Sequence, residues 1–208
     1  MPTPLITIQN LKISKSNKTL LNDTEFSIHK FDRIILVGTN GCGKSSLLKI
    51  LKGVDVPDQG EIWIAPNIKI DLLEQNPPIP TINNLSDFIS KYNDHRNLSK
   101  INFIVEQLGL SNIDLTKKLS GGEIRKIYLA QSILNEPDIM LLDEPTNHID
   151  LPTIDWLEKK LLELNTTMII VSHDQEFLKK IGTRTFWFNE TQLIKREGTY
   201  NNFFEWTK

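Results

Sequence analysis

The sequence lacks both a second cysteine and a long apolar run. Cys42 is the single cysteine of the 208 residues, so a disulfide within the chain is excluded as a source of stability. No stretch reaches the roughly 18 to 20 apolar residues that cross a bilayer, and the first residues do not have the charged and apolar regions of a signal peptide. We therefore expect a cytoplasmic protein with no direct membrane insertion.

An excess of one charge is also missing, because the formal net charge is only −2. Such a chain has no extended basic field that would bind nucleic acid along its whole surface, so any contact with RNA must be local. The length and the 39% hydrophobic content are enough for one α/β core and too small for two of typical size. We expect one domain over residues 1–208.

What the chain does contain is a glycine-rich stretch directly after an apolar one. Residues 38–46 read GTNGCGKSS and follow the apolar run Ile34–Val37, and Gly53 ends the helix expected next. In such a loop the backbone N–H groups surround phosphate oxygens, Lys44 reaches the β- and γ-phosphates, and Ser45 binds Mg²⁺. The pattern therefore predicts binding of a nucleoside triphosphate. The residues expected at the nucleotide are Gly38, Asn40, Gly41, Cys42, Gly43, Lys44, Ser45 and Ser46.

Two further apolar runs also end in polar residues. Ile139–Leu142 and Met168–Val171 are typical of strands buried on both faces. The first leads to Asp143 and Glu144, and the second leads to His173. Because ligands bind at the carboxyl ends of strands in a parallel sheet, we expect these side chains to meet the phosphate loop at one site.

The residue types at these strand ends suit transfer of a phosphoryl group to water. Asp143 could hold Mg²⁺ together with Ser45, and Glu144 could accept a proton from the attacking water. His173 is predicted to contact the γ-phosphate, and Gln75 to bind Mg²⁺ or the water through its amide oxygen. The alternatives are a solvated acidic turn, a structural histidine and an ordinary loop glutamine.

A second candidate anion site lies at Leu119–Glu123, where Ser120, Gly121 and Gly122 open a helix. Ser120 and Glu123 have the spacing of a capping box, so a well-capped helix is the alternative. Glycines weaken a helix by roughly 1 kcal/mol each, which argues against capping alone. One nucleotide does not need two such sites. We therefore expect the second to serve the nucleotide of another protomer, in a head-to-tail pair.

The remaining patterns predict an α/β fold with a mostly parallel core sheet, an antiparallel β-subdomain and a small helical subdomain. Residues 5–13 alternate in polarity, as expected of a strand at the edge of an antiparallel sheet. The helical subdomain is expected at about 78–135. Further strands are expected at 25–28, 61–64 and 68–73, helical segments between 82 and 110, and a terminal hairpin at 185–188 and 192–195.

Taken together, these segments resemble an ATP-binding cassette (ABC) ATPase domain over essentially the whole chain. The resemblance implies a P-loop NTPase fold, ATP and Mg²⁺ as ligands, and ATP hydrolysis. It also adds Asp150 to the nucleotide interface. In the family's terms the segments resemble Walker A at 38–46, the Q-loop at Gln75, the signature at Leu119–Glu123, Walker B at Ile139–Glu144, the D-loop at Asp150 and the switch histidine at His173.

Within that superfamily, residues 143–150, DEPTNHID, are similar to the corresponding stretch of the ABC-F class. Residues 73–78, 153–158 and 198–200 look like the first cassette of its Uup-type members. The class implies soluble, duplicated cassettes that act on ribosomes. Two features depart from it. The adenine-stacking aromatic is absent near residues 15–17, and residues 76–118 are too few to hold the helical arm of the class.

The leading hypothesis is an ABC-F-like ATPase domain that pairs with a second cassette, as a homodimer or with a separate chain, and contacts the ribosome or RNA. One alternative is the nucleotide-binding subunit of a membrane transporter, docked on a permease. Another is a truncated cassette that binds ATP without turnover, which the missing aromatic and arm suggest.

Overall fold

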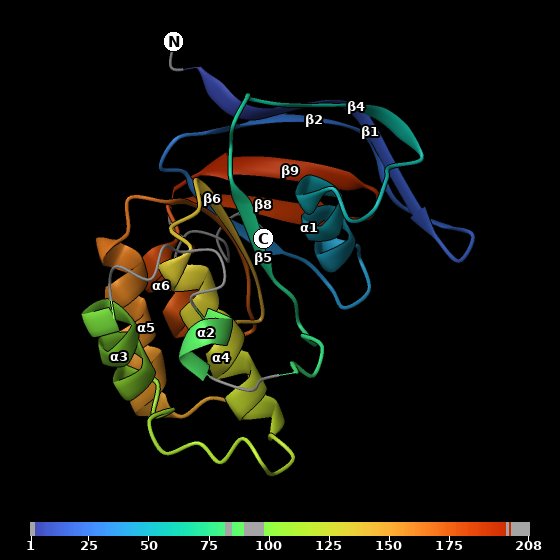
Figure 1. The fold of residues 1–208 in the computed structure, drawn as a ribbon. Helices are drawn as coiled ribbons and strands as arrows, with labels where there is room; N and C mark the ends of the chain where they lie inside the picture. The colour runs from blue at the N-terminus through green and yellow to red at the C-terminus, as the bar shows by residue number, and fades with distance from the viewer. Residues whose placement is uncertain (1–2, 82–84, 90–97, 199, 201–208) are drawn as a thin grey trace.

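The computed structural model describes residues 3–81, 85–89, 98–198 and 200, which form two sheets and a set of helices (Figure 1). The strands are β1 (Pro4–Lys15), β2 (Lys18–His29), β3 (Arg33–Val37), β4 (Gln59–Ile64), β5 (Ile70–Leu73), β6 (Ile139–Asp143), β7 (Thr167–Val171), β8 (Arg184–Asn189) and β9 (Gln192–Glu197). The helices are α1 (Lys44–Lys52), α2 (Leu85–Ile89), α3 (Leu98–Gln107), α4 (Gly121–Leu134), α5 (Leu151–Glu163) and α6 (Gln175–Ile181).

The larger sheet has six strands in the order β5-β6-β7-β3-β8-β9. All neighbouring pairs are parallel except β8 and β9, which form the terminal antiparallel hairpin. The three strands that lead to the predicted site, β6, β7 and β3, are consecutive in this order. This confirms the predicted mostly parallel core sheet, and it brings the three carboxyl ends next to one another.

Both faces of this sheet are covered, which explains the continuous apolar runs. In β6, Ile139 and Leu141 belong to one hydrophobic core, whereas Met140 and Leu142 belong to another. The first core lies against α1 and the smaller sheet, and the second lies against α4, α5 and α6. Successive side chains of a strand point to opposite faces, so a strand between two cores must be apolar at every position.

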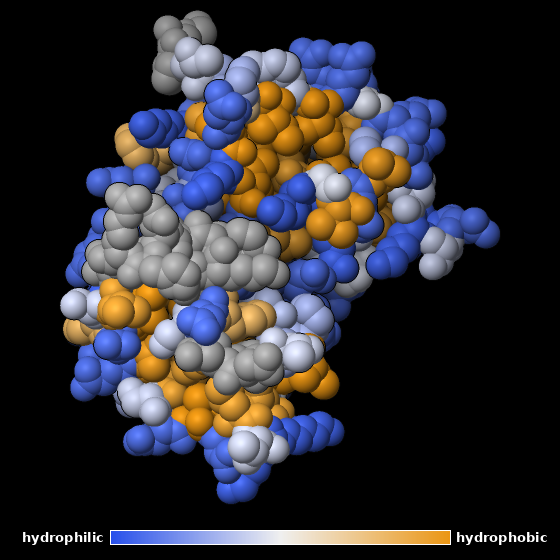
Figure 2. Space-filling model, viewed as in Figure 1, coloured by the Kyte–Doolittle hydropathy of each residue, from blue (hydrophilic) through white to orange (hydrophobic). Residues whose placement is uncertain are grey.

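The smaller sheet has three antiparallel strands in the order β2-β1-β4. This corrects the expectation that the first strand lies at an edge, because β1 pairs with β2 on one side and β4 on the other. Alternating polarity indicates which face of a strand is exposed to solvent. It carries no information on whether the strand pairs with one neighbour or with two. Apolar surface gathers over this sheet and α1 in Figure 2. The exposed large apolar side chains in and near these elements include Val54, Val56, Trp63 and Ile64.

The helical part lies beside the larger sheet, with α2 and α3 packed on α4 (Figure 1). The helical segments predicted between 82 and 110 correspond to α2 and α3, and residues 82–84 and 90–97 lie outside the described residues. Gly53, at φ 78°, ends α1, and Asn135 ends α4, both as predicted. In the described ranges, no helix combines the length and apolar character needed to cross a membrane.

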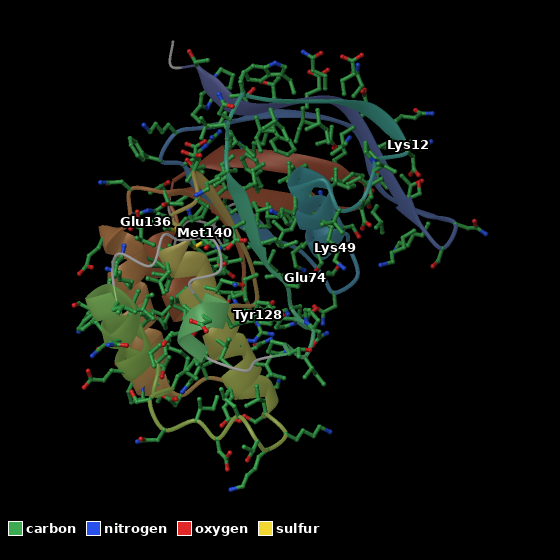
Figure 3. The ribbon with its side chains drawn as sticks, viewed as in Figure 1. Lys12, Lys49, Glu74, Tyr128, Glu136 and Met140 are labelled. Carbon is green, nitrogen blue, oxygen red and sulfur yellow. The ribbon has the colours of Figure 1, made fainter. Side chains whose placement is uncertain are left out.

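An ion pair fixes the segment that carries Gln75 against the first helix. Lys49 of α1 and Glu74, one residue beyond β5, point toward each other in Figure 3, with 3.2 Å between Nζ and Oε2. Both side chains are more than a third exposed, so this pair contributes little to stability. Its geometric effect is to hold the start of the loop after β5 close to the helix that begins at Lys44.

We expect Leu141→Ala to lower the free energy of unfolding by about 2–5 kcal/mol, because Leu141 is fully buried between two packed layers. Leu151→Ala is the matched control. Leu151 is 76% exposed at the start of α5, so its truncation should change stability by less than about 0.5 kcal/mol. Urea denaturation measures both, and equal effects would contradict the assignment of β6 to the centre of the core.

Candidate functional site

The loop between β3 and α1 has the backbone that a phosphate-binding turn needs. Gly43 is the N-cap of α1 at φ 113°, a conformation that side chains rarely adopt. A Cβ atom there would also lie 3.1 Å from Cβ of Leu20. The helix therefore begins at Lys44 with its free N–H groups directed at the loop, which is a favourable setting for an anion.

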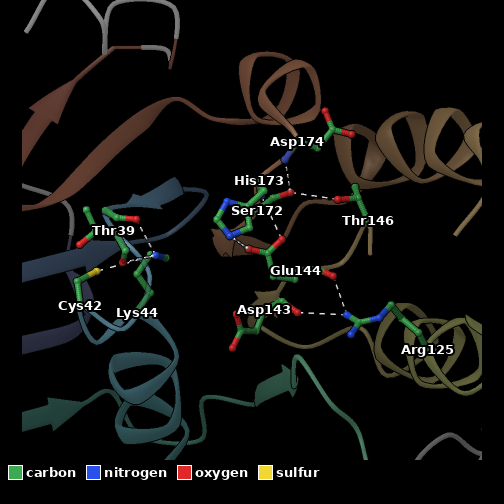
Figure 4. A network of polar contacts seen from close by, with 11 residues as sticks. Thr39, Cys42, Lys44, Arg125, Asp143, Glu144, Thr146, Ser172, His173 and Asp174 are labelled. Atoms are coloured by element: carbon green, nitrogen blue, oxygen red, sulfur yellow. Dashed lines mark hydrogen bonds and ion pairs between the residues drawn. The ribbon is translucent and has the colours of Figure 1, made fainter. Parts of the chain in front are cut away.

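Lys44 lies within the loop, and the loop's own carbonyl groups accept hydrogen bonds from it. Its Nζ donates to the Gly38 carbonyl at 2.8 Å and to the Thr39 carbonyl at 3.1 Å (Figure 4). Cys42 is buried below, with Sγ 3.9 Å from the same ammonium. Cys42 thus fills space under the loop, and Lys44 is the loop's charged group.

A cleft of about 430 Å³ joins the loop to the other predicted residues. Its lining includes three residues that the sequence analysis did not select, Lys15, Leu20 and Val171. Gly38 lines a neighbouring cavity with Ser172 and His173. The predicted residues that line the cleft itself are Asn40, Gly41, Gly43, Lys44, Ser45, Ser46, Gln75, Asp143, Glu144 and His173, whereas Cys42 does not line it.

Asp143 ends β6 with only 4% of its surface exposed. Burial raises the pKa of its carboxyl group, while a hydrogen bond with Ser45 and the charge of Lys44 act in the opposite direction. The Asp143 and Ser45 oxygens suit Mg²⁺, which takes oxygen ligands. In proteins, water and substrate phosphate usually supply several of these ligands. Among the described residues there is no cluster of three or more histidine, cysteine or acidic side chains for a metal. The donor set therefore fits Mg²⁺ held jointly with phosphate oxygens.

Glu144 faces His173 across the cleft (Figure 4). The backbone N–H of His173 donates to Oε2 at 3.1 Å, and Nε2 of its ring lies 3.4 Å from Oε1. Burial raises the pKa of Glu144, and the His173 contacts offset part of that shift. The Glu144 side chain is 3% exposed, whereas that of His173 is 64% exposed. The carboxylate is thus fixed, and the imidazole lies at the open side.

The remaining predicted residues form a separate group at the N-terminus of α4. Ser120 and Glu123 make the predicted capping box, and a Cβ atom on Gly122 would lie 2.5 Å from the His148 carbonyl oxygen. Asp150 caps α5 and pairs with Lys126 at 2.7 Å. The Lys126 hydrogen bond lowers the pKa of Asp150.

This second group does not line the cleft. Ser120, Gly121, Gly122 and Asp150 are all absent from the cleft lining, and the sequence analysis assigns the first three to the nucleotide of another protomer and Asp150 to the nucleotide interface. Close packing is reason enough for glycine at 122, whereas a Cβ atom on Gly121 would meet nothing within 4 Å. Gly121 therefore has no packing explanation among the described residues.

We expect Gly122→Ala to lower the free energy of unfolding by about 1–3 kcal/mol, because the new Cβ would overlap the rigid His148 carbonyl. Gly121→Ala is the matched control. It adds the same methyl group into open space and should be neutral or stabilise the helix by up to about 1 kcal/mol. Thermal or urea unfolding without nucleotide measures both, and an undiminished stability of Gly122→Ala would contradict the contact.

Comparison with known proteins identifies the family of the chain. The family model described as ABC transporter matches residues 21–147. The ATP-binding protein Uup of Buchnera aphidicola (subsp. Acyrthosiphon pisum) is 38% identical over 96% of this chain, and the chain spans 35% of that protein. The energy-dependent translational throttle protein EttA of Mycobacterium tuberculosis is 26% identical over 97% of the chain, which spans 43% of its length.

Among solved structures, a bacterial Atm1-family ABC exporter with ATP bound superposes with a TM-score of 0.82. The match covers 99% of this chain and 40% of that one, and at 17% identity it supports the fold alone. The order of the segments, the P-loop fold and the family match agree. The chain therefore belongs to the ABC transporter family, and within it is similar to the Uup proteins of the ABC-F class.

Proposed function

We propose that this chain is an ABC-type ATPase domain that binds Mg-ATP in the cleft and hydrolyses it. The supporting observation is that groups from three strand ends line one cleft: Lys44 and Ser45 after β3, Asp143 and Glu144 after β6, and His173 after β7. Cation, metal ligands and base are the parts that phosphoryl transfer to water requires.

In the proposed reaction the loop N–H groups and Lys44 hold the β- and γ-phosphates. Ser45 and Asp143 would hold Mg²⁺, with Gln75 as a further oxygen ligand. Bound there, Mg²⁺ would supply positive charge against the negative charge that develops on the phosphate oxygens. Glu144 accepts a proton from water as the water oxygen bonds to the γ-phosphorus, and the bond from phosphorus to the β,γ-bridging oxygen breaks. ADP and phosphate are the products.

The surroundings of Glu144 support its role as the base. Its raised pKa makes it a better proton acceptor than an exposed glutamate, while the hydrogen bond from the His173 amide fixes one carboxylate oxygen. His173 is exposed on the open side of the cleft, where its ring could donate to a γ-phosphate oxygen. We assign it that contact, and Gln75 the alignment of the metal or the water.

We further propose that two cassettes pair head to tail, so that Ser120, Gly121, Gly122 and Asp150 of one face the nucleotide of the other. Their separation from the cleft of their own chain supports this arrangement. The second cassette is either another copy or a separate chain. The name of EttA, a translational throttle protein, supports a role in translation with a ribosomal or RNA partner. We also propose a cytoplasmic location, with residues 1–208 as one domain that contains a helical subdomain at about 78–135.

Glu144→Gln should retain Mg-ATP binding and lose turnover by at least about 100-fold, because the amide cannot accept the proton from water. Lys44→Ala separates binding from chemistry, since it removes the loop's cation and should weaken Mg-ATP binding itself. Lys159→Ala, an exposed residue on α5, is the control for loss of a lysine charge. Calorimetry and phosphate release measure the two properties, and unchanged turnover in Glu144→Gln would refute the proposed base.

The partner proposal is tested by sedimentation of the Glu144→Gln variant, which should accumulate in the ATP-bound, paired state. We expect it to sediment with ribosomal particles in ATP and to remain in the supernatant in ADP. Recovery of a membrane subunit in its place would favour the transporter alternative. Sedimentation with neither would contradict both partners.

A further inference from the structure

Arg125 of α4 is a buried cation that does not line the cleft. Only 3% of its surface is exposed, yet its guanidinium makes no hydrogen bond to a carboxylate within the described ranges. Buried arginines are rare unless they are paired. The acceptors of Arg125 are instead three backbone carbonyl groups, from Gln75, Asp143 and Glu144. All three belong to residues that we assign to metal binding or to catalysis.

The guanidinium joins three segments that are far apart in the sequence. Nη1 donates to the Glu144 carbonyl at 2.6 Å and to the Asp143 carbonyl at 3.3 Å, as Figure 4 shows. Nη2 donates to the Gln75 carbonyl. Arg125 thus connects α4 both to the end of β6 and to the loop after β5. A planar group with several fixed donors is well suited to such a bridge, and a lysine is not.

The same side chain has a feature that does not favour stability. Nε of Arg125 is buried and has no hydrogen-bond partner in the part of the chain that the structure describes. Burial also lowers the pKa of the guanidinium, although the charges of Asp143 and Glu144 act against this. A group needed only for packing would be replaced at lower cost by an apolar side chain of similar volume. The arrangement therefore points to a role beyond holding α4 on the sheet.

The backbone of Glu144 shows what that role is. Glu144 has φ 55°, in the left-handed region, which is unfavourable for a residue other than glycine. Its N–H donates to the Val171 carbonyl at 2.8 Å, and its carbonyl accepts from Arg125 and from the Asn147 N–H at 3.2 Å. These contacts hold the peptide groups on both sides of the Glu144 side chain, and so fix the direction in which the carboxylate points.

We propose that Arg125 is a positioning residue that holds Glu144 in its left-handed conformation, with the carboxylate facing His173. Because the same guanidinium holds the Gln75 carbonyl, the base and the loop after β5 are set by one side chain on α4. The inference rests on the proposed function, since it concerns alignment for hydrolysis. It requires that loss of Arg125 impair turnover while leaving the phosphate loop, and hence binding of Mg-ATP, intact.

The test compares Arg125→Gln with Arg33→Gln in the full 208-residue chain. Arg33 also donates to backbone carbonyls, at 2.9 Å to that of Leu162, but it begins β3 and so lies at the amino ends of the parallel strands, whereas the cleft lies at their carboxyl ends. We expect Arg125→Gln to lower kcat by about 10- to 100-fold, with KM and Kd for Mg-ATP within about threefold of wild type. Arg33→Gln should leave all three unchanged. Equal kcat in wild type and Arg125→Gln overturns the proposal.

A double-mutant comparison tells positioning from general structural support. If Arg125 acts through Glu144, adding Arg125→Gln to Glu144→Gln should lower kcat by less than about twofold further. A full additional 10- to 100-fold loss would mean that Arg125 acts elsewhere, and would overturn the proposal. The proposal would also be overturned if kcat and the number of Mg-ATP binding sites per chain fell in the same proportion. That pattern indicates a smaller folded fraction.

Arg125→Lys is the second variant if Arg125→Gln does not fold. Its ammonium lacks the planar set of donors with which the guanidinium contacts the Gln75, Asp143 and Glu144 carbonyl groups at once, so we expect a three- to tenfold loss of kcat at unchanged Kd. Wild-type kcat in Arg125→Lys then overturns the proposal. The proposed function is judged separately. Wild type without turnover, or Glu144→Gln with wild-type turnover, refutes the ATPase assignment and this inference with it, whereas an unimpaired Arg125 variant refutes only the inference.

Discussion

Burial of the six-stranded sheet on both faces is the constraint on which the site depends. Strands such as β6 and β7 lie between two hydrophobic cores, so a charged side chain within them would have no contact with water. The chain can present such groups only where the strands end. Since β6, β7 and β3 are neighbours, their carboxyl ends form one continuous edge. The order of the strands thus brings the phosphate loop, the acidic pair and His173 together.

The pKa values of the acidic pair reflect a balance between burial on one side and hydrogen bonds and positive charge on the other. Burial raises the pKa of both Asp143 and Glu144, and hydrogen bonds together with nearby cations counter the shift. The largest opposing contribution at Asp143 is the Ser45 hydrogen bond, followed by Lys44, Arg125 and Lys49. At Glu144 it comes from His173. Each carboxylate therefore has a different environment, although the two residues are adjacent in the chain.

The sequence was informative wherever structure is local. The strand before the phosphate loop, the end of α1 at Gly53 and the capping box at Ser120 all follow from short patterns with a direct physical cause. Most residues of the cleft were likewise predictable, because each follows the end of a recognisable buried strand. The mostly parallel sheet followed from the apolar runs, since each is uniformly apolar rather than alternating.

What could not be predicted depends on contacts between distant segments. The central place of β1 is set by pairing with β4, which alternation within β1 does not encode. Lys15 and Leu20 enter the cleft because the hairpin of β1 and β2 lies over the phosphate loop. Arg125 precedes Lys126, and two adjacent basic residues are usually solvated, so the pattern did not predict that Arg125 is 3% exposed and the Lys126 side chain 16% exposed. The only available signal was that apolar residues, Ile124 and Ile127, stand on either side of Arg125 and Lys126 in the sequence.

The contact between Gly122 and His148 has a mechanical consequence. At the start of α4, Gly122 lies so close to the turn that follows Glu144 that a Cβ atom on it would be 2.5 Å from the His148 carbonyl oxygen. Side chains absorb small shifts by changing rotamer, but two backbones in direct contact have no such freedom. A displacement of the start of α4 toward this turn would therefore have to move the turn as well. The chain thus contains a stiff link between the group at Ser120 and the loop beyond its acidic pair.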